Sequence, residues 1–140
     1  MLIKQVSVFV ENKTGRLSAI LNILKDKKIN IRALSIADTH DFGILRLITD
    51  NPDNAYNALK NEDCTVTVND LIAVCIGDEP GCLAAIVDLL AKNDINIEYM
   101  YDFNSHSNDF ASIVLRVTDN LKAIEILKSN DIRLLDIGEI

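Results

Sequence analysis

Residues 11–31, ENKTGRLSAILNILKDKKINI, and residues 78–97, DEPGCLAAIVDLLAKNDINI, decide the fold because they are two versions of one segment. Each contains a glycine, a leucine two positions later, an apolar stripe at helical spacing and then Ile-Asn-Ile. Gly15 and Gly81 are 66 positions apart (81 − 15). The same offset relates Leu17 and Leu83, Ile20 and Ile86, Leu24 and Leu90, Ile29 and Ile95, Asn30 and Asn96, and Ile31 and Ile97. A constant offset over a whole segment predicts an internal duplication.

The apolar periodicity in each copy predicts the order β-α-β-β-α-β. In the first copy, alternation predicts strands at 2–10, 29–37, 42–49 and 65–68, and helical spacing predicts helices at 17–24 and 54–60, the latter opened by Asn-Pro-Asp. The second copy repeats the order at 71–76, 82–92, 96–103, 110–118, 121–128 and 134–137. The predicted fold class is α+β, with two ferredoxin-like units in tandem, 1–69 and 70–140. We expect four-stranded antiparallel sheets packed side by side, with the helices on one face.

Composition excludes several classes of function. The chain has 140 residues, of which 49% are hydrophobic and 25% charged, and its net charge is -7. An acidic chain without a Lys/Arg cluster is a poor candidate for nucleic acid or an anionic membrane surface. Its N-terminus reads as a strand rather than a signal peptide, and no apolar run is long enough for a membrane helix. Cys64, Cys75 and Cys82 lack CxxC spacing, so we expect reduced, partly buried thiols in a cytoplasmic protein.

Two predicted strands are apolar on both sides, LIAVCI at 71–76 and FASIVL at 110–115. Strands of this kind are usually covered on both faces. We therefore expect a homodimer, or another partner, on the face of the sheet that the helices leave open. The alternative is a modest exposed patch.

Each glycine lies between a predicted strand and a helix, where free N–H groups and the helix dipole form an anion site. Gly15 lets the backbone approach a ligand, and the Thr14 hydroxyl can cap the helix. Asn30 and Asn96 are expected next to these loops, where an amide can donate to a carboxylate and accept from an ammonium group. Together the groups suit a small zwitterion such as an amino acid. The same residues can instead be ordinary turn residues.

The paired segments resemble the opening half of the ACT domain, a βαββαβ regulatory module with the pattern Asn/Asp-x-x-Gly-x-Leu, a helix, and an Asn between apolar residues. The resemblance covers essentially the whole chain as two copies. It implies amino-acid binding where ACT units meet side by side. The residues that it implies are Asn12, Lys13, Thr14, Gly15, Arg16, Leu17 and Asn30 in the first copy, and Asp78, Glu79, Pro80, Gly81, Cys82, Leu83 and Asn96 in the second.

The two copies depart from that pattern in different ways. Asp78 replaces the Asn and cannot donate to a carboxylate, and Glu79 adds negative charge. Some family members have a His just ahead of the motif, where this chain has Val10 and Ile76. Lys13 and Arg16 make the first loop the better place for a carboxylate. The two sites are therefore expected to differ in ligand, or one is empty.

No catalytic set accompanies these loops. His40 and His106 have no second histidine at metal-ligand spacing, and neither a GxxxxGK[ST] phosphate loop nor CxxC is present. We expect no enzyme activity, cofactor or metal. The first hypothesis is an amino-acid-binding regulatory protein for a separate catalytic subunit, such as the small subunit of an acetolactate-synthase-type enzyme. The second is an interaction module without a ligand.

Overall fold

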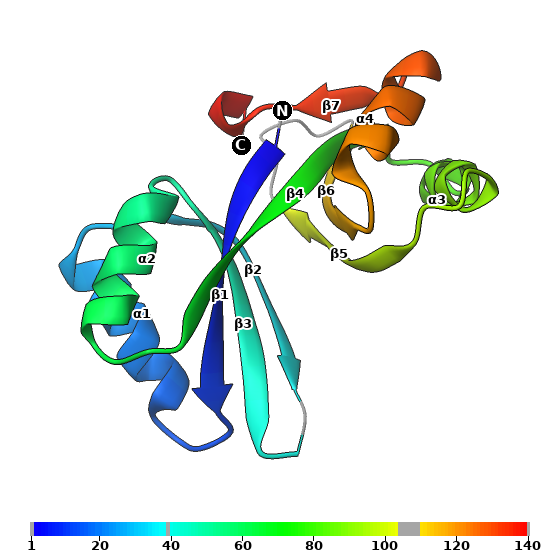
Figure 1. Ribbon diagram of the computed structural model, residues 1–140. Coiled ribbons are helices and arrows are strands. Elements are labelled where there is room, and N and C mark those ends of the chain that lie inside the picture. Colours follow the sequence, from blue (N-terminus) through cyan, green and yellow to red (C-terminus); the bar gives the residue numbers. More distant parts are fainter. Residues whose placement is uncertain (1, 39, 104–109, 140) are drawn as a thin grey trace. The chain divides into compact units, whose positions relative to one another are not determined.

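The computed structural model describes residues 2–38, 40–103 and 110–139. The fold is α+β, with antiparallel strands and four α-helices in that part of the chain (Figure 1). The chain divides into two compact units, Lys4–Asn69 and Asp70–Ile140, the second together with Met1–Ile3. Each unit is described by itself below.

The unit Lys4–Asn69 contains β1 (Leu2–Glu11) from Lys4 onward, α1 (Arg16–Asp26), β2 (Ile31–Asp38), β3 (Phe42–Thr49), α2 (Pro52–Asn61) and the start of β4 (Val66–Gly77). Its strands follow the order β2-β3-β1-β4, with β3 antiparallel to both β1 and β2. The helix α2 starts as its sequence predicts, because Asn51 Oδ1 accepts a hydrogen bond from the Asn54 N–H at 3.1 Å and Pro52 occupies the first turn.

The core of this unit joins its helices to alternate residues of its strands. One buried cluster contains Val6 and Val8 of β1, Leu45 and Leu47 of β3, Ile20 and Leu24 of α1, and Ala55, Ala58 and Leu59 of α2. Residues two apart on a strand point to the same face, so both helices pack against one face of β1 and β3. Helices α1 and α2 lie side by side on that face (Figure 1).

The second unit repeats this plan. It contains the rest of β4, α3 (Cys82–Lys92), β5 (Ile97–Phe103), β6 (Phe110–Val117), α4 (Asn120–Ser129), β7 (Arg133–Leu135) and a short 3-10 helix, Ile137–Glu139. Strand β4 lies between β7 and β6, and β6 pairs with β5, all antiparallel. Its core cluster includes Ile72, Val74, Ile86, Leu90, Ile113, Leu115, Ala123 and Leu127. Core positions on the first helices, such as Leu24 and Leu90, keep the 66-residue offset, whereas those on the second helices, such as Ala55 and Ala123, are 68 residues apart.

One predicted boundary is wrong. The sequence predicts a strand ending at Val68 and another starting at Leu71, but both belong to the single strand β4, which is 12 residues long. The unit boundary, between Asn69 and Asp70, therefore falls inside a strand. Asn and Asp usually favour turns because their side chains bond to nearby backbone groups. Here other partners hold both residues in extended backbone.

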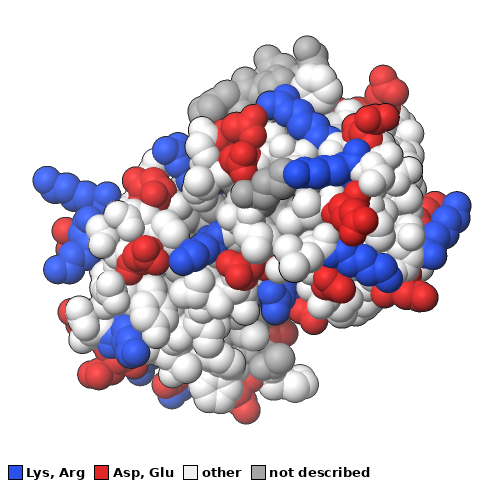
Figure 2. Space-filling model, turned by 45° about the horizontal axis from the view of Figure 1, so that its top comes forward, with Lys and Arg blue, Asp and Glu red and all other residues white. Residues whose placement is uncertain are grey.

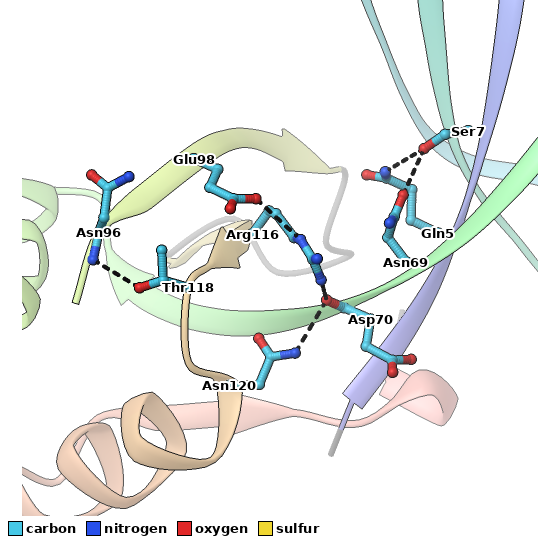
Figure 3. A network of polar contacts seen from close by, with 9 residues as sticks. All are labelled: Gln5, Ser7, Asn69, Asp70, Asn96, Glu98, Arg116, Thr118 and Asn120. Atoms are coloured by element: carbon cyan, nitrogen blue, oxygen red, sulfur yellow. Dashed lines mark hydrogen bonds and ion pairs between the residues drawn. The ribbon is translucent and has the colours of Figure 1, made fainter.

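Polar contacts surround these two residues (Figure 3). In the first unit, Ser7 Oγ donates to Asn69 Oδ1 at 3.1 Å and accepts from Gln5 Nε2 at 2.8 Å. In the second unit, the Asp70 carbonyl accepts from Arg116 Nη1 at 3.1 Å and from Asn120 Nδ2 at 3.4 Å. The bond from Ser7 occupies the side-chain oxygen of Asn69, whereas the bonds to Asp70 hold its backbone carbonyl.

The apolar residues on the face of the sheet opposite the helices are already buried, contrary to the expectation that a partner covers them. Leu71, Ala73 and Val114, which made the predicted strands apolar on both sides, are fully buried in the single chain. They supply no free surface, so these strands give no reason for a partner on this face. A homodimer stays a prediction and needs another surface.

We predict that Ser7→Ala lowers the free energy of unfolding by about 1–3 kcal/mol, because buried Gln5 and half-buried Asn69 each lose a partner. Ser35→Ala is the matched control, since Ser35 is a half-buried strand serine on β2 whose hydroxyl has no hydrogen-bond partner among the described residues. Urea denaturation measures both variants. Equal stabilities would contradict a structural role for the Ser7 contacts.

Candidate functional site

The two strand-to-helix loops have nearly the same backbone. Gly15 precedes α1 with φ 88° and ψ -13°, and Gly81 precedes α3 with φ 95° and ψ -14°. These are left-handed conformations, which non-glycine residues adopt at a cost. A Cβ added to either glycine would meet nothing within 4 Å. Backbone conformation, rather than crowding, therefore explains why both copies have glycine.

The expected cap at Thr14 is wrong. The residue at the cap position of α1 is Gly15, and no side chain caps this helix. The turn is closed by backbone instead, because the Arg16 N–H donates to the Lys13 carbonyl at 3.2 Å. In the second loop the Cys82 N–H donates to the Glu79 carbonyl, also at 3.2 Å. The next N–H groups of each helix lack intrahelical acceptors and can donate to an anion.

The charges of the two loops differ as their sequences predict. In the first loop, Glu11 also lies close to both cations. Glu11 Oε2 lies 3.3 Å from Lys13 Nζ and 3.9 Å from Arg16 Nε, so a carboxylate already faces both cations. These pairs are exposed and weak, and an incoming carboxylate can compete with Glu11. The second loop has Gly77 in place of Glu11 and carries Asp78 and Glu79 without a nearby cation in its own sequence.

A hollow of about 140 Å³ adjoins the first loop. It is lined by Val10, Glu11, Asn12, Lys13, Leu17, Ile36, Asp38 and Gly43. Three of the predicted residues, Asn12, Lys13 and Leu17, thus share one site. The sequence argument missed Asp38 and Ile36, which come from β2 and whose only signal was their place at the end of that strand. Ligand pockets usually enclose about 300–1,000 Å³, so this hollow alone is smaller than a typical ligand pocket.

Asn30 does not lie beside this loop, contrary to expectation. The Asn12 N–H donates to the Asp41 carbonyl at one end of β3, whereas the Asn30 N–H donates to Asp50 Oδ1 at the other end. The eight residues of β3 separate the two asparagines by roughly 25 Å, at about 3.3 Å per residue. One amino acid cannot contact both within a unit.

Asn96 has the same setting in the second unit. Its N–H donates to Thr118 Oγ1 at 3.2 Å, and its carbonyl accepts from the Thr118 N–H at 3.1 Å (Figure 3). Asn30 and Asn96 are exposed, and neither side-chain amide has a hydrogen-bond partner among the described residues. Both amides are available to a ligand or to another molecule.

Two further hollows occupy equivalent places beside α1 and α3. A cleft of about 750 Å³ is bounded by the end of β4, α3, Phe110 and residues 130–133. A cleft of about 430 Å³ has the same boundaries in the first unit, namely the end of β1, α1, Phe42 and residues 62–65. The larger cleft includes Cys82 and the smaller one Arg16, which are equivalent predicted residues.

An exposed ion pair forms beside the larger cleft. Arg133 Nη2 donates to Glu139 Oε1 at 2.7 Å, and the Asp136 N–H donates to Glu139 Oε2 at 2.9 Å. The Asp136 N–H and then the Arg133 hydrogen bond lower the pKa of Glu139, and the bond to Glu139 raises the pKa of Arg133. Arg133 is thus engaged with Glu139, which reduces its use as an anion-binding group.

Other candidate chemistry finds no geometric support in the part of the chain that the structure describes. His40 is exposed, and His106 lies outside the described residues. Across residues 2–38, 40–103 and 110–139, no group of three His, Cys, Asp or Glu residues is placed to hold a metal. Nor does any described helix have the length and apolarity needed to cross a membrane. Figure 2 shows acidic and basic side chains interspersed on the face drawn, without a basic patch.

The family described as "ACT domain pair" matches residues 1–138. The chain belongs to the ACT domain pair family. A search of curated proteins gave no match. The element order and the duplicated loops thus have the origin that the resemblance implied.

Solved structures place this ACT pair among similar folds. Protein BT0572 from Bacteroides thetaiotaomicron is 40% identical with a TM-score of 0.93, over 99% of this chain and 95% of that one. The regulatory subunit of aspartate kinase from Thermus thermophilus is 14% identical with a TM-score of 0.66, over 91% and 93%. The corresponding subunit from Thermus flavus is 15% identical with the same score, over 90% and 88%. For the two kinase subunits, identities this low show the fold alone.

We predict that Gly15→Ala destabilises the ACT pair by about 1–2 kcal/mol, because alanine at this position adopts a left-handed backbone. Gly138→Ala is the control, since that glycine lacks a positive φ and also has open space around its Cα. Thermal denaturation compares the two. If Gly15→Ala is no less stable than Gly138→Ala, the strain argument is wrong.

We predict that Cys64 is alkylated slowly at pH 8. Burial, and then the neighbouring acids Glu62 and Asp63, raise the pKa of its thiol and so reduce the reactive thiolate. Iodoacetamide labelling followed by peptide mass spectrometry measures the rate. Glu62→Gln should increase it and Glu98→Gln should not, because Glu98 pairs with Arg116 instead. An unchanged rate in Glu62→Gln would count against the electrostatic contribution.

Proposed function

We propose that this ACT pair is a regulatory protein that binds an amino acid at its strand-to-helix loops and controls a separate metabolic enzyme. The observation that carries the proposal is the hollow beside Asn12. It combines the unpaired N–H groups at the start of α1 with the Asn12 amide and the Asp38 carboxylate. These groups complement the carboxylate and ammonium of an amino acid.

The positions of the two asparagines define how such a site is completed. Because Asn12 and Asn30 lie at opposite ends of β3, a ligand that contacts both must lie between two ACT units that run in opposite directions. A ligand held in this way stabilises one arrangement of the units over others, which is the physical basis of regulation. The full predicted set of loop residues, from Asn12 to Leu17 and from Asp78 to Leu83, with Asn30 and Asn96, belongs to this proposal.

The second loop supports a different role. Asp78 and Glu79 suit an ammonium group but repel a carboxylate, so this loop fits a zwitterion less well than the first. An interaction module without a ligand is therefore the second candidate function, at least for the unit Asp70–Ile140.

The names of two similar structures support a proposal for the regulated enzyme. Two of the similar structures are named as regulatory subunits of aspartate kinase, which favours a separate catalytic partner in amino-acid metabolism. An acetolactate-synthase-type enzyme is the alternative from the sequence. We propose no catalytic activity, cofactor or metal for the chain itself, and a cytoplasmic location.

A thermal-shift screen against the twenty amino acids and several 2-oxo acids tests binding. A ligand at a hundred times its dissociation constant adds about 2.7 kcal/mol to stability, which is a shift of several degrees for a chain of this size. A shift confined to one class of side chain would identify the ligand. No shift with any compound would favour the interaction module.

With the best ligand, we predict that Asn12→Ala and Asn30→Ala each weaken binding about tenfold or more, the effect of losing one hydrogen bond to a charged group. Both side chains are exposed, so stability should change little. Asn57→Ala on α2 is the control, because Asn57 is exposed and distant in sequence from both loops. Calorimetry with unchanged affinity in both test variants would refute this site.

A further inference from the structure

The cleft beside α3 differs from its equivalent beside α1 in the size of its lining side chains. It encloses about 750 Å³, against about 430 Å³ for the smaller cleft, although both have the same boundaries. At three equivalent positions, 66 residues apart, a bulky side chain of the smaller cleft corresponds to a small one in the larger. These pairs are Phe9 and Cys75, Glu11 and Gly77, and Arg16 and Cys82. The second unit thus has the more open cleft, within the volume range of sites for small molecules.

Gly77 helps to keep the larger cleft open. A Cβ at this position would lie 3.2 Å from Cys82 Sγ, closer than ordinary van der Waals contact. Gly77 has no positive φ, so its backbone conformation does not require glycine. Strand β7 pairs with β4 only as far as Cys75, and no strand of the described residues continues that pairing along Ile76 and Gly77. One of these two residues therefore directs its backbone N–H and C=O to the unpaired edge, where a ligand can bond to them.

The first two turns of α3 give the cleft an apolar wall. The lining residues of these turns follow helical spacing and form one stripe, Cys82, Ala85, Ile86 and Leu89. Ile132, between α4 and β7, and Phe110, at the start of β6, also line the cleft (Figure 1). Phe110 is 49% exposed and Leu89 is half-buried, so the core leaves part of this apolar surface in contact with water. A ligand with an apolar body would cover it.

The larger cleft is also less acidic than the smaller one. The smaller cleft is lined by three acidic residues and one basic residue, namely Glu11, Glu62, Asp63 and Arg16. The larger cleft is lined by two of each, namely Asp88, Asp131, Lys92 and Arg133. The formal charge of the lining is therefore -2 (1 − 3) in the smaller cleft and 0 (2 − 2) in the larger. An anion is repelled less by the second of these clefts.

Lys92 is the cation that can receive an anionic group. It has no ion pair with any of the described residues, whereas Arg133 pairs with Glu139 at 2.7 Å. The position of α1 equivalent to Lys92 is Asp26, which is not among the residues that line the smaller cleft. Asp88 and Asp131 stay close to the ligand, which favours a single negative charge over a polyanion.

We propose that the cleft beside α3 is a binding site for a small organic anion, with a mainly apolar body and one negative group that lies near Lys92. This site is separate from the strand-to-helix loops. Leu83, the equivalent of Leu17 at the hollow beside Asn12, lies about 200° around the axis of α3 from Ala85. The inference does not rest on the proposed function, which concerns the loops.

A fluorescent probe with the proposed chemistry tests the cleft. Anilinonaphthalene sulfonate is an aromatic monoanion whose fluorescence rises when it leaves water. Ala85→Trp places a large side chain in the apolar stripe and should weaken probe binding at least about tenfold. Ala84→Trp is the matched control, because Ala84 is also exposed on α3 but does not line the cleft. Thermal denaturation of both variants shows that each is folded.

An uncharged analogue tests the need for a negative group. Phenylnaphthylamine has the same rings without the sulfonate. Lys92→Asp copies the residue of the first unit and should weaken sulfonate binding about fivefold or more, because an attraction becomes a repulsion. Binding of phenylnaphthylamine should stay within about twofold. Lys25→Asp is the control, since Lys25 is an exposed lysine in the last turn of α1.

Thiol protection tells the two clefts apart. Cys82 lines the larger cleft and Cys64 the smaller one. The sulfonate should slow the alkylation of Cys82 by iodoacetamide and leave the rate at Cys64 unchanged, as measured by peptide mass spectrometry. The titration should also reach one probe per chain, because only the second unit has the open cleft.

The outcomes separate this inference from the proposed function. Equal probe affinities of Ala85→Trp and Ala84→Trp would overturn the site. Equal sulfonate affinities of Lys92→Asp and Lys25→Asp would overturn the role of the negative group, and equal protection of Cys64 and Cys82 would overturn the difference between the clefts. If the sulfonate does not bind while an amino acid still shifts the melting temperature, this inference fails and the proposed function stands. Asn12→Ala should leave probe binding unchanged.

Discussion

The packing of one amphipathic helix against alternate strand residues is the constraint on which each unit depends. A unit of about 70 residues has little interior, so α1 and α3 must each bury their apolar stripe on the face formed by the first and third strands of their unit. That packing constrains where α1 and α3 start, and in both units the residue immediately before the start has a left-handed backbone. Gly15 and Gly81 follow from the core in this sense, and the free N–H groups beside them are a by-product that a ligand can use.

Much of this fold is readable from the sequence because its signals are local and repeated. The apolar stripe from Leu17 to Leu24 gives α1, and Asn51 with Pro52 gives the start of α2. The strand β4 is different. Asn69 and Asp70 have local turn preferences, and what overrides them is contact with Ser7 and with Arg116, which are distant in sequence. Propensity cannot reveal partners 46 or more positions away.

The candidate site also combines residues that a local motif identifies with residues whose position depends on strand pairing. Asn12, Lys13 and Leu17 lie within six consecutive positions of one motif, and they line one hollow. Asp38 and Ile36 were missed because their place in the hollow depends on the register between β2 and β3. Asn30 lies at the other end of the unit, because residues that are close in the motif are separated by the length of β3. Because of this separation, a site that needs both Asn12 and Asn30 cannot be contained in one unit.

The uninterrupted course of β4 has a consequence for modularity. Most tandem domains are joined by a linker, so that each can be excised, exchanged or lost during evolution. Here the first residues of β4 pair with β1, and later ones pair with β6 and β7. A cut between Asn69 and Asp70 would pass through the interior of a strand and fray an edge in both halves. The two copies of the repeat therefore share one strand, and neither can be removed without breaking that strand.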